Sequence, residues 1–123
     1  MKTKLLALSI FALGLIAAPL AATVSFAADK KGSFSSAGSR YKVSGTATVS
    51  ADGTIKLSGF KTSSGPDLYV YVGNGRPSTP VAKLRRNSGS QTYKISASLA
   101  KKISTVHIHC KRFNHLFGTA RVK

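Results

Sequence analysis

The sequence predicts a small all-β protein, and three observations support that prediction. Apolar and polar side chains alternate over much of the chain after residue 40, with the period of two that is typical of β-strands. Turn-forming pairs such as Asp52-Gly53 separate the alternating stretches, and the pattern at residues 98–102 predicts no more than one helical turn. About eight short strands joined in this way favour a small antiparallel β-sandwich or barrel.

Residues 1–27 have the features of a cleavable signal peptide. Two lysines precede an apolar run of 14 residues from Leu5 to Ala18, which is shorter than the roughly 20 residues of a membrane-spanning helix. Small residues lie at the two positions that a signal peptidase reads before a cut after Ala27. We therefore expect one exported domain, residues 28–123, that is periplasmic or extracellular and has no membrane span after cleavage.

The strands of this domain are expected from the alternation and the turns between them. In residues 41–49 the odd positions are apolar or small, and the pattern resumes after a hairpin with Ile55 and Leu57 facing inward. Residues 68–72 are apolar on both faces, which predicts a central strand covered on both sides. Further strands are expected at residues 81–84, 91–96, 105–110 and 116–122.

The chain is strongly basic, with 19 Lys and Arg residues against 3 acidic residues and a net charge of +16. Cleavage would leave 17 basic residues against 3 aspartates, a surplus of 14 positive charges. Such a field attracts acidic lipids, acidic glycans or nucleic acid, although it also simply aids solubility. The scattered basic residues and the lack of a nucleic-acid-binding motif argue against specific nucleic-acid recognition.

Cys110 is the sole cysteine of the chain, so no internal disulfide can form, although secreted domains of this size usually contain them. On the strand predicted here Cys110 shares a face with Val106 and Ile108 and should point toward the core. A buried thiol of this kind behaves as a small apolar group. Lys111 and Arg112 would instead favour a thiolate if the sulfur lies near the strand end.

Three histidines lie close together in the sequence and raise the question of a metal site. His107 and His109 are expected on the exposed face of their strand, where they would form a two-ligand pair with His115 as a third donor. Cys110 points to the other face, so His107, His109 and Cys110 cannot bind one metal ion from a regular strand. Surface histidines without a metal are the simpler interpretation.

Asp67 is one of only three carboxylates and follows a glycine-proline turn. Its expected role is local, either accepting backbone N–H groups or pairing with a nearby cation. Asp29 and Asp52 lie at a terminus and in a hairpin, so a hydrolase built on paired carboxylates is not favoured. A Cys-His nucleophilic enzyme with His115 as base lacks any accompanying family motif. The sequence therefore does not favour a conventional enzyme, and an enzymatic role stays undecided.

Four blocks of sequence, read together, resemble a known family. They are GPDLYVYV at residues 65–72, GSQTYKI at 89–95, VHIHCKRFN at 106–114 and FGTA at 117–120. In this order and spacing they resemble the DM-thirteen domain, the "electron transfer" domain of secreted and cell-surface proteins, over nearly all of residues 32–122.

The resemblance implies a β-rich extracytoplasmic domain whose family cysteine matches Cys110. It implies a redox or electron-transfer role, through a bare thiol or through a prosthetic group such as haem or a metal. Cys110, His109 and Asp67 are then the candidate cofactor-binding residues. His109 stands where relatives often place an aromatic residue before the cysteine, so the resemblance leaves the cofactor undecided.

Three hypotheses follow from the sequence. The first is a redox module centred on Cys110 that acts with an unidentified redox partner. The second is a basic module that binds an acidic glycan, lipid or protein surface and has a structural cysteine. The third is a metal-binding accessory protein that uses His107 and His109. A Cys110→Ser variant separates the first from the others, and the salt sensitivity of binding identifies the second.

Overall fold

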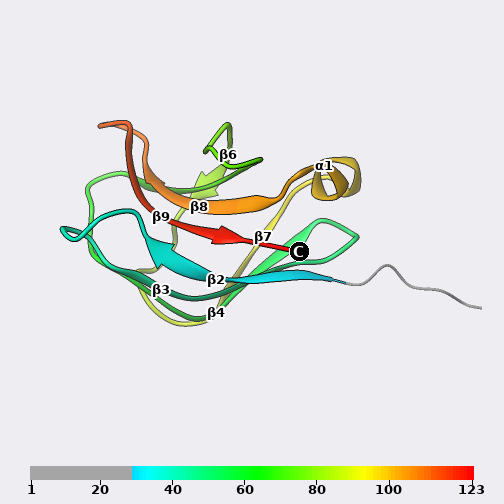
Figure 1. Ribbon diagram of the computed structural model, residues 1–123, viewed down its shortest axis with the longest axis horizontal. Helices are drawn as coiled ribbons and strands as arrows, with labels where there is room; N and C mark the ends of the chain where they lie inside the picture. The colour runs from blue at the N-terminus through cyan, green and yellow to red at the C-terminus, as the bar shows by residue number, and fades with distance from the viewer. Residues whose placement is uncertain (1–28) are drawn as a thin grey trace, which may run out of the picture.

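The structure is a computed structural model that describes residues 29–123, and the predicted signal peptide lies outside these residues. Eight antiparallel strands form one sheet in the order β6-β5-β8-β9-β2-β3-β4-β7 (Figure 1). The all-β prediction is confirmed. In the part of the chain that the structure describes, no helix is long and apolar enough to cross a membrane. The elements are β2 (Lys30–Ser36), β3 (Val43–Val49), β4 (Thr54–Thr62), β5 (Leu68–Gly73), β6 (Thr79–Lys83), β7 (Gln91–Lys94), α1 (Ala97–Lys102), β8 (Thr105–Cys110) and β9 (His115–Arg121).

The sheet curls until its two edge strands, β6 and β7, approach each other. Arg85, which follows β6, bridges them: its backbone N–H donates to the Tyr93 hydroxyl at 3.0 Å, and its guanidinium donates to the Thr92 carbonyl at 2.5 Å. The Tyr93 hydroxyl in turn donates to the Gln91 side-chain carbonyl at 2.5 Å. The two edges therefore protect each other, and the sheet is a nearly closed barrel.

Alternate residues of each strand fill the barrel, as the period of two predicts. Val70 of β5 lies opposite Ile108 of β8, and both are fully buried. The inward direction expected for Ile55 and Leu57 is confirmed, because both are also fully buried. The other fully buried apolar residues are Ala47, Val49, Phe60, Val72, Val106, Cys110 and Ala120.

Two strands differ most from the sequence-based expectation, and β6 is shifted, since the strand expected at 81–84 spans Thr79–Lys83. The pattern assigned no strand to residues 30–36, because Phe34 is the sole buried side chain of β2 and a single apolar residue cannot show alternation. Pairing with β3 and β9 creates this strand. The expected strand 91–96 ends at Lys94, because Ser96 instead caps α1 by accepting the Leu99 N–H at 3.1 Å.

A bulge in β9 shapes one end of the barrel. Ile108 pairs with Gly118 and His109 pairs with Leu116, so Phe117 is the extra residue. Only glycine fits at position 118, because a Cβ atom there would lie 2.7 Å from the Cβ of Val43, which is too close for two carbon atoms. The hairpin between β8 and β9 lies at one end of the molecule, and α1 lies at the opposite end (Figure 1).

Candidate functional site

Cys110 is the last residue of β8 and points into the barrel at the end formed by the β8–β9 hairpin. Its side chain is 1% exposed, and it lies opposite Leu68 on β5 and His115 on β9. Directly opposed residues of an antiparallel pair share one face of the sheet. His115 therefore stands beside Cys110 on the inner side of the hairpin.

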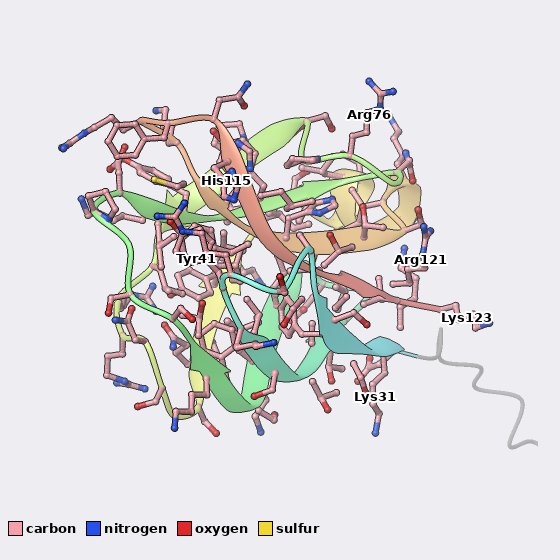
Figure 2. The ribbon with its side chains drawn as sticks, turned by 60° about the vertical axis from the view of Figure 1, so that its left-hand side comes forward. Lys31, Tyr41, Arg76, His115, Arg121 and Lys123 are labelled. Atoms are coloured by element: carbon pink, nitrogen blue, oxygen red, sulfur yellow. The ribbon has the colours of Figure 1, made fainter. Side chains whose placement is uncertain are left out.

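A cavity of about 250 Å³ opens at this end of the barrel, and Cys110 is one of the residues that line it. Tyr41 stacks on Phe117 with ring centroids 4.0 Å apart, and it meets the His115 ring edge-on at 5.4 Å. Figure 2 shows Tyr41 and His115 on the same side of the molecule. We call this the mouth cavity; its remaining lining residues are Arg40, Ser64, Gly65, Pro66 and Phe113.

The mouth cavity is aromatic and cationic. The guanidinium of Arg40 lies 5.5 Å from the centre of the Tyr41 ring, and Phe113 is 65% exposed at the rim. Lys111, which the sequence places next to the thiol, instead has its amino group 5.0 Å from the Tyr69 ring, on the other face of the sheet. Arg40 is therefore the cation that shares a cavity with Cys110, and none of the lining residues is a carboxylate.

His107 lies on the outer face of β8, but it is fully buried, so the expectation of an exposed histidine is wrong. Its Nδ1 is 2.9 Å from the Thr119 hydroxyl and its Nε2 is 2.8 Å from the Thr105 hydroxyl. The Thr105 hydroxyl also accepts the Gly75 N–H at 3.0 Å. Burial lowers the pKa of His107 to about 4. The ring is therefore a neutral structural group with both nitrogens occupied.

His109 is also buried on the outer face, with 5% of its surface exposed. Its Nε2 is 3.1 Å from the side-chain oxygen of Asn114, and an amide oxygen only accepts, so Nε2 carries the hydrogen. The Tyr71 ring packs against the His109 ring in a T-shaped arrangement, with the ring centroids 4.9 Å apart. Within residues 29–123 its Nδ1 is buried without a hydrogen-bond partner. His109 and Cys110 point to opposite faces and do not converge on one site.

The comparison with known families agrees with this architecture. The family model described as electron transfer DM13 matches residues 33–122. The chain belongs to the electron transfer DM13 family. The match runs from β2 through β9, so this DM13 domain includes Cys110, and the resemblance drawn from the sequence motifs is confirmed. None of the curated proteins and none of the solved structures matches the chain.

The candidate metal ligands of this DM13 domain do not come together. His107 and His109 lie on the outer face of β8, whereas His115 lies beside Cys110. Residues 29–123 contain no group of three His, Cys, Asp or Glu side chains that could hold a metal ion. Asp67 has the local role, since its carboxylate is 3.4 Å from the amino group of Lys83.

A haem ligated by both Cys110 and His109 does not fit this DM13 domain. The mouth cavity of about 250 Å³ adjoins a second cavity of about 420 Å³, and Arg40, Tyr41, His115 and Phe117 line both. His109 cannot serve as a second ligand to the same iron, because it lies on the other face of the sheet.

Sequence reasoning missed the aromatic wall of the mouth cavity. Arg40 and Tyr41 are about 70 positions away from Cys110 in the sequence, and the fold alone brings them to the thiol. Phe117 appeared as an ordinary strand residue, because nothing in the pattern marks the bulge. The partner of His107 on its own strand, Thr105, was detectable, since residues two apart share a face.

Proposed function

We propose that this DM13 domain is an exported redox module in which Cys110 is the group that is oxidised and reduced. One observation supports this above the others: Cys110 lines the mouth cavity, whereas Val106 and Ile108, on the same face of β8, are enclosed in the core. The family match to an electron-transfer domain agrees with a redox role. The thiol thus sits where the apolar interior meets an opening.

The residues around the thiol suit oxidation by a small molecule. The cavity of about 250 Å³ has room for a small molecule beside the sulfur, and Tyr41 and Phe117 form part of its wall. His115 lies opposite Cys110 in the hairpin, and its exposed ring can accept the thiol proton and release it to solvent. Arg40 contributes positive charge to the same cavity.

The proposed oxidant is a peroxide. The Cys110 thiolate attacks one peroxide oxygen, the O–O bond breaks, and the sulfur loses two electrons to become a sulfenic acid. The other oxygen leaves as a hydroxide or alkoxide, which takes up the proton that the thiol released, so the peroxide is reduced to water or an alcohol.

A small thiol would return the sulfur to its starting state. The first molecule of that thiol condenses with the sulfenic acid to give a mixed disulfide and water. A second molecule attacks the mixed disulfide, which releases Cys110 as a thiol and leaves the reductant as its own disulfide. The reductant must come from elsewhere, because the chain has one cysteine.

Trapping of the oxidised sulfur tests this proposal. Folded protein is treated with hydrogen peroxide in the presence of dimedone, which reacts with sulfenic acids, and is then analysed by peptide mass spectrometry. We expect one adduct on Cys110, no adduct in Cys110→Ser, and restoration of the thiol by a small thiol when dimedone is omitted. Labelling of Cys110 only after addition of denaturant would overturn the proposal.

The export part of the proposal has its own test. Full-length protein expressed in a bacterial host is fractionated, and the N-terminus of the exported form is sequenced. We expect the exported chain to begin at Ala28. A chain that keeps residues 1–27 and remains inside the cell would contradict export, and it would leave the chemistry of Cys110 untouched.

A further inference from the structure

The outer face of the barrel carries a second cavity, whose lining is polar, unlike the aromatic lining of the mouth cavity. It has a volume of about 240 Å³ and is lined by Ser33, Ser35, Gly75, Thr119 and Arg121. Three of these side chains are hydroxyls and one is a guanidinium, and no carboxylate is among the lining residues. We call it the hydroxyl cavity.

The pairing of β2 with β9 builds the hydroxyl cavity. Phe34 of β2 lies opposite Ala120 of β9, and both are buried in the core. Their neighbours along the two strands, Ser33 and Ser35 on β2 and Thr119 and Arg121 on β9, therefore point outward. Ser35 lies directly opposite Thr119, which places their hydroxyls side by side on the outer face. Arg121 follows Thr119 by two positions and therefore extends from the same face.

A rigid hydrogen-bonded network lies beneath this cavity. The Thr119 hydroxyl is bound to Nδ1 of His107 at 2.9 Å, and Thr105 joins that ring to the Gly75 N–H. His107 is neutral, because burial lowers its pKa to about 4, with smaller contributions in the same direction from His109 and Arg121. The network therefore fixes the cavity wall, and it supplies no negative charge to neutralise Arg121.

The surroundings of the hydroxyl cavity are cationic. The two ion pairs of residues 29–123 are Lys83–Asp67 and Lys94–Asp52, so two of the three aspartates are used away from this face. Figure 2 shows Arg76, Arg121, Lys123 and Lys31 on one side of the molecule, opposite Tyr41 and His115. Arg121 lines the cavity itself and belongs to neither of these ion pairs, so an anion that enters the cavity meets its positive charge.

We propose that the hydroxyl cavity binds a tetrahedral oxyanion, the phosphate or sulfate group of a larger anionic molecule. A guanidinium and hydroxyl donors are groups that bind phosphate oxygens well. The lining residues come from β2, from β9 and from the loop that contains Gly75, and a tetrahedral oxyanion offers more acceptor oxygens to such donors than a carboxylate does. This site is independent of Cys110 and of the proposed redox role.

Titration of the protein with inorganic phosphate tests this proposal. Two-dimensional NMR spectra of the mature protein are recorded at constant ionic strength, with acetate as the comparison anion. We expect phosphate to shift the backbone signals of Ser33, Ser35 and Thr119 and the ring signals of His107, and acetate to bind more weakly. Shifts spread evenly over the basic residues of the whole surface would overturn the proposal.

Substitutions separate a built site from general attraction. Arg121→Gln should weaken phosphate binding about ten-fold, because it removes a charge-assisted hydrogen bond, and Ser35→Ala should weaken it about two- to three-fold. Arg112→Gln is the matched control: it removes the same charge from an exposed turn at the other end of the barrel and should leave binding unchanged. Equal weakening by the two arginine variants would contradict a site at the hydroxyl cavity.

Two larger probes identify the source of the anion. Inorganic polyphosphate represents a linear polymer, and vesicles containing phosphatidylglycerol represent an anionic lipid surface. Binding of either probe that Arg121→Gln weakens and Arg112→Gln does not supports the proposal and names the source. If both probes bind and the two substitutions weaken their binding equally, the proposal is overturned.

Discussion

The two faces of β8 bury their side chains in different ways. All six residues of the strand are buried, but the inner face carries Val106, Ile108 and Cys110, whereas the outer face carries Thr105 and two histidines. The inner side chains are buried by apolar packing. On the outer face, burial of the two histidines is compensated by hydrogen bonds to threonine hydroxyls and to the Asn114 amide. Burial alone therefore does not tell which histidine or cysteine of this strand is chemically active.

The difference assigns separate roles to the two faces. On the outer face both ring nitrogens of His107 are held, so this histidine is a fixed structural element. On the inner face the strand ends at Cys110, where packing gives way to the mouth cavity. Substitutions confined to one face at a time test this division.

The largest effect should come from the middle of the inner face. Ile108 is fully buried, so Ile108→Ala should lower the free energy of unfolding by about 2–5 kcal/mol, through lost apolar contact and the cavity that remains. Ile108→Val, as the milder control, should cost about 0.5–1.5 kcal/mol. Denaturant unfolding measures both, and a cost below about 1 kcal/mol for Ile108→Ala would show that the barrel interior is poorly packed.

The outer face should make stability depend on pH. The pKa of His107 is about 4 in the fold and 6.5 in the unfolded chain, so below pH 6.5 the unfolded state binds the extra proton. The stability of the fold should therefore fall as the pH drops from about 6.5 to 4, by at most about 3 kcal/mol. Denaturant unfolding at several pH values measures this.

His107→Gln is the control for the pH dependence. Its side chain does not titrate, so the loss of stability between pH 6.5 and 4 should be much smaller than in the wild type, even though the variant is less stable at neutral pH. An equally steep loss in the variant would assign the pH dependence to other groups.

A smaller effect is expected at the end of the inner face. Cys110→Ser places a hydroxyl among apolar neighbours and should cost about 1–3 kcal/mol, whereas Cys110→Ala removes only the sulfur and should cost about 1 kcal/mol. Thermal and denaturant unfolding of the two variants give this order. A serine variant as stable as the wild type would indicate that the sulfur is more hydrated than its 1% exposure implies.

The smallest effect on stability should come from His115, which is exposed in the hairpin. His115→Ala should change the free energy of unfolding by no more than about 0.5 kcal/mol, yet it should slow oxidation of Cys110 several-fold, since the neighbouring proton acceptor is lost. Rates are measured by disappearance of the thiol under peroxide. An unchanged rate would remove His115 from the redox role and leave that of Cys110 intact.

Much of the fold was predictable because period-two alternation reflects burial directly. Strand 105–110 and the inward direction of Cys110 follow from the pattern of one short segment. The pattern could not show that loop residues such as Gly75 cover the outer face, so it misjudged the exposure of the histidines. Long-range register is likewise invisible in local sequence, which is why Tyr41 and the bulge at Phe117 were not connected with the thiol.

The central claim is that Cys110 is reached through the mouth cavity while the barrel stays folded. The most direct test compares rates of thiol modification in native and urea-unfolded protein, using a small reagent, methyl methanethiosulfonate, and a bulky one, Ellman's reagent. We predict that the native fold slows the bulky reagent far more than the small one, and that Tyr41→Ala, which opens the wall, reduces this difference. Equal protection against both reagents, unaffected by Tyr41→Ala and lost only on unfolding, would show that Cys110 is a sealed core residue.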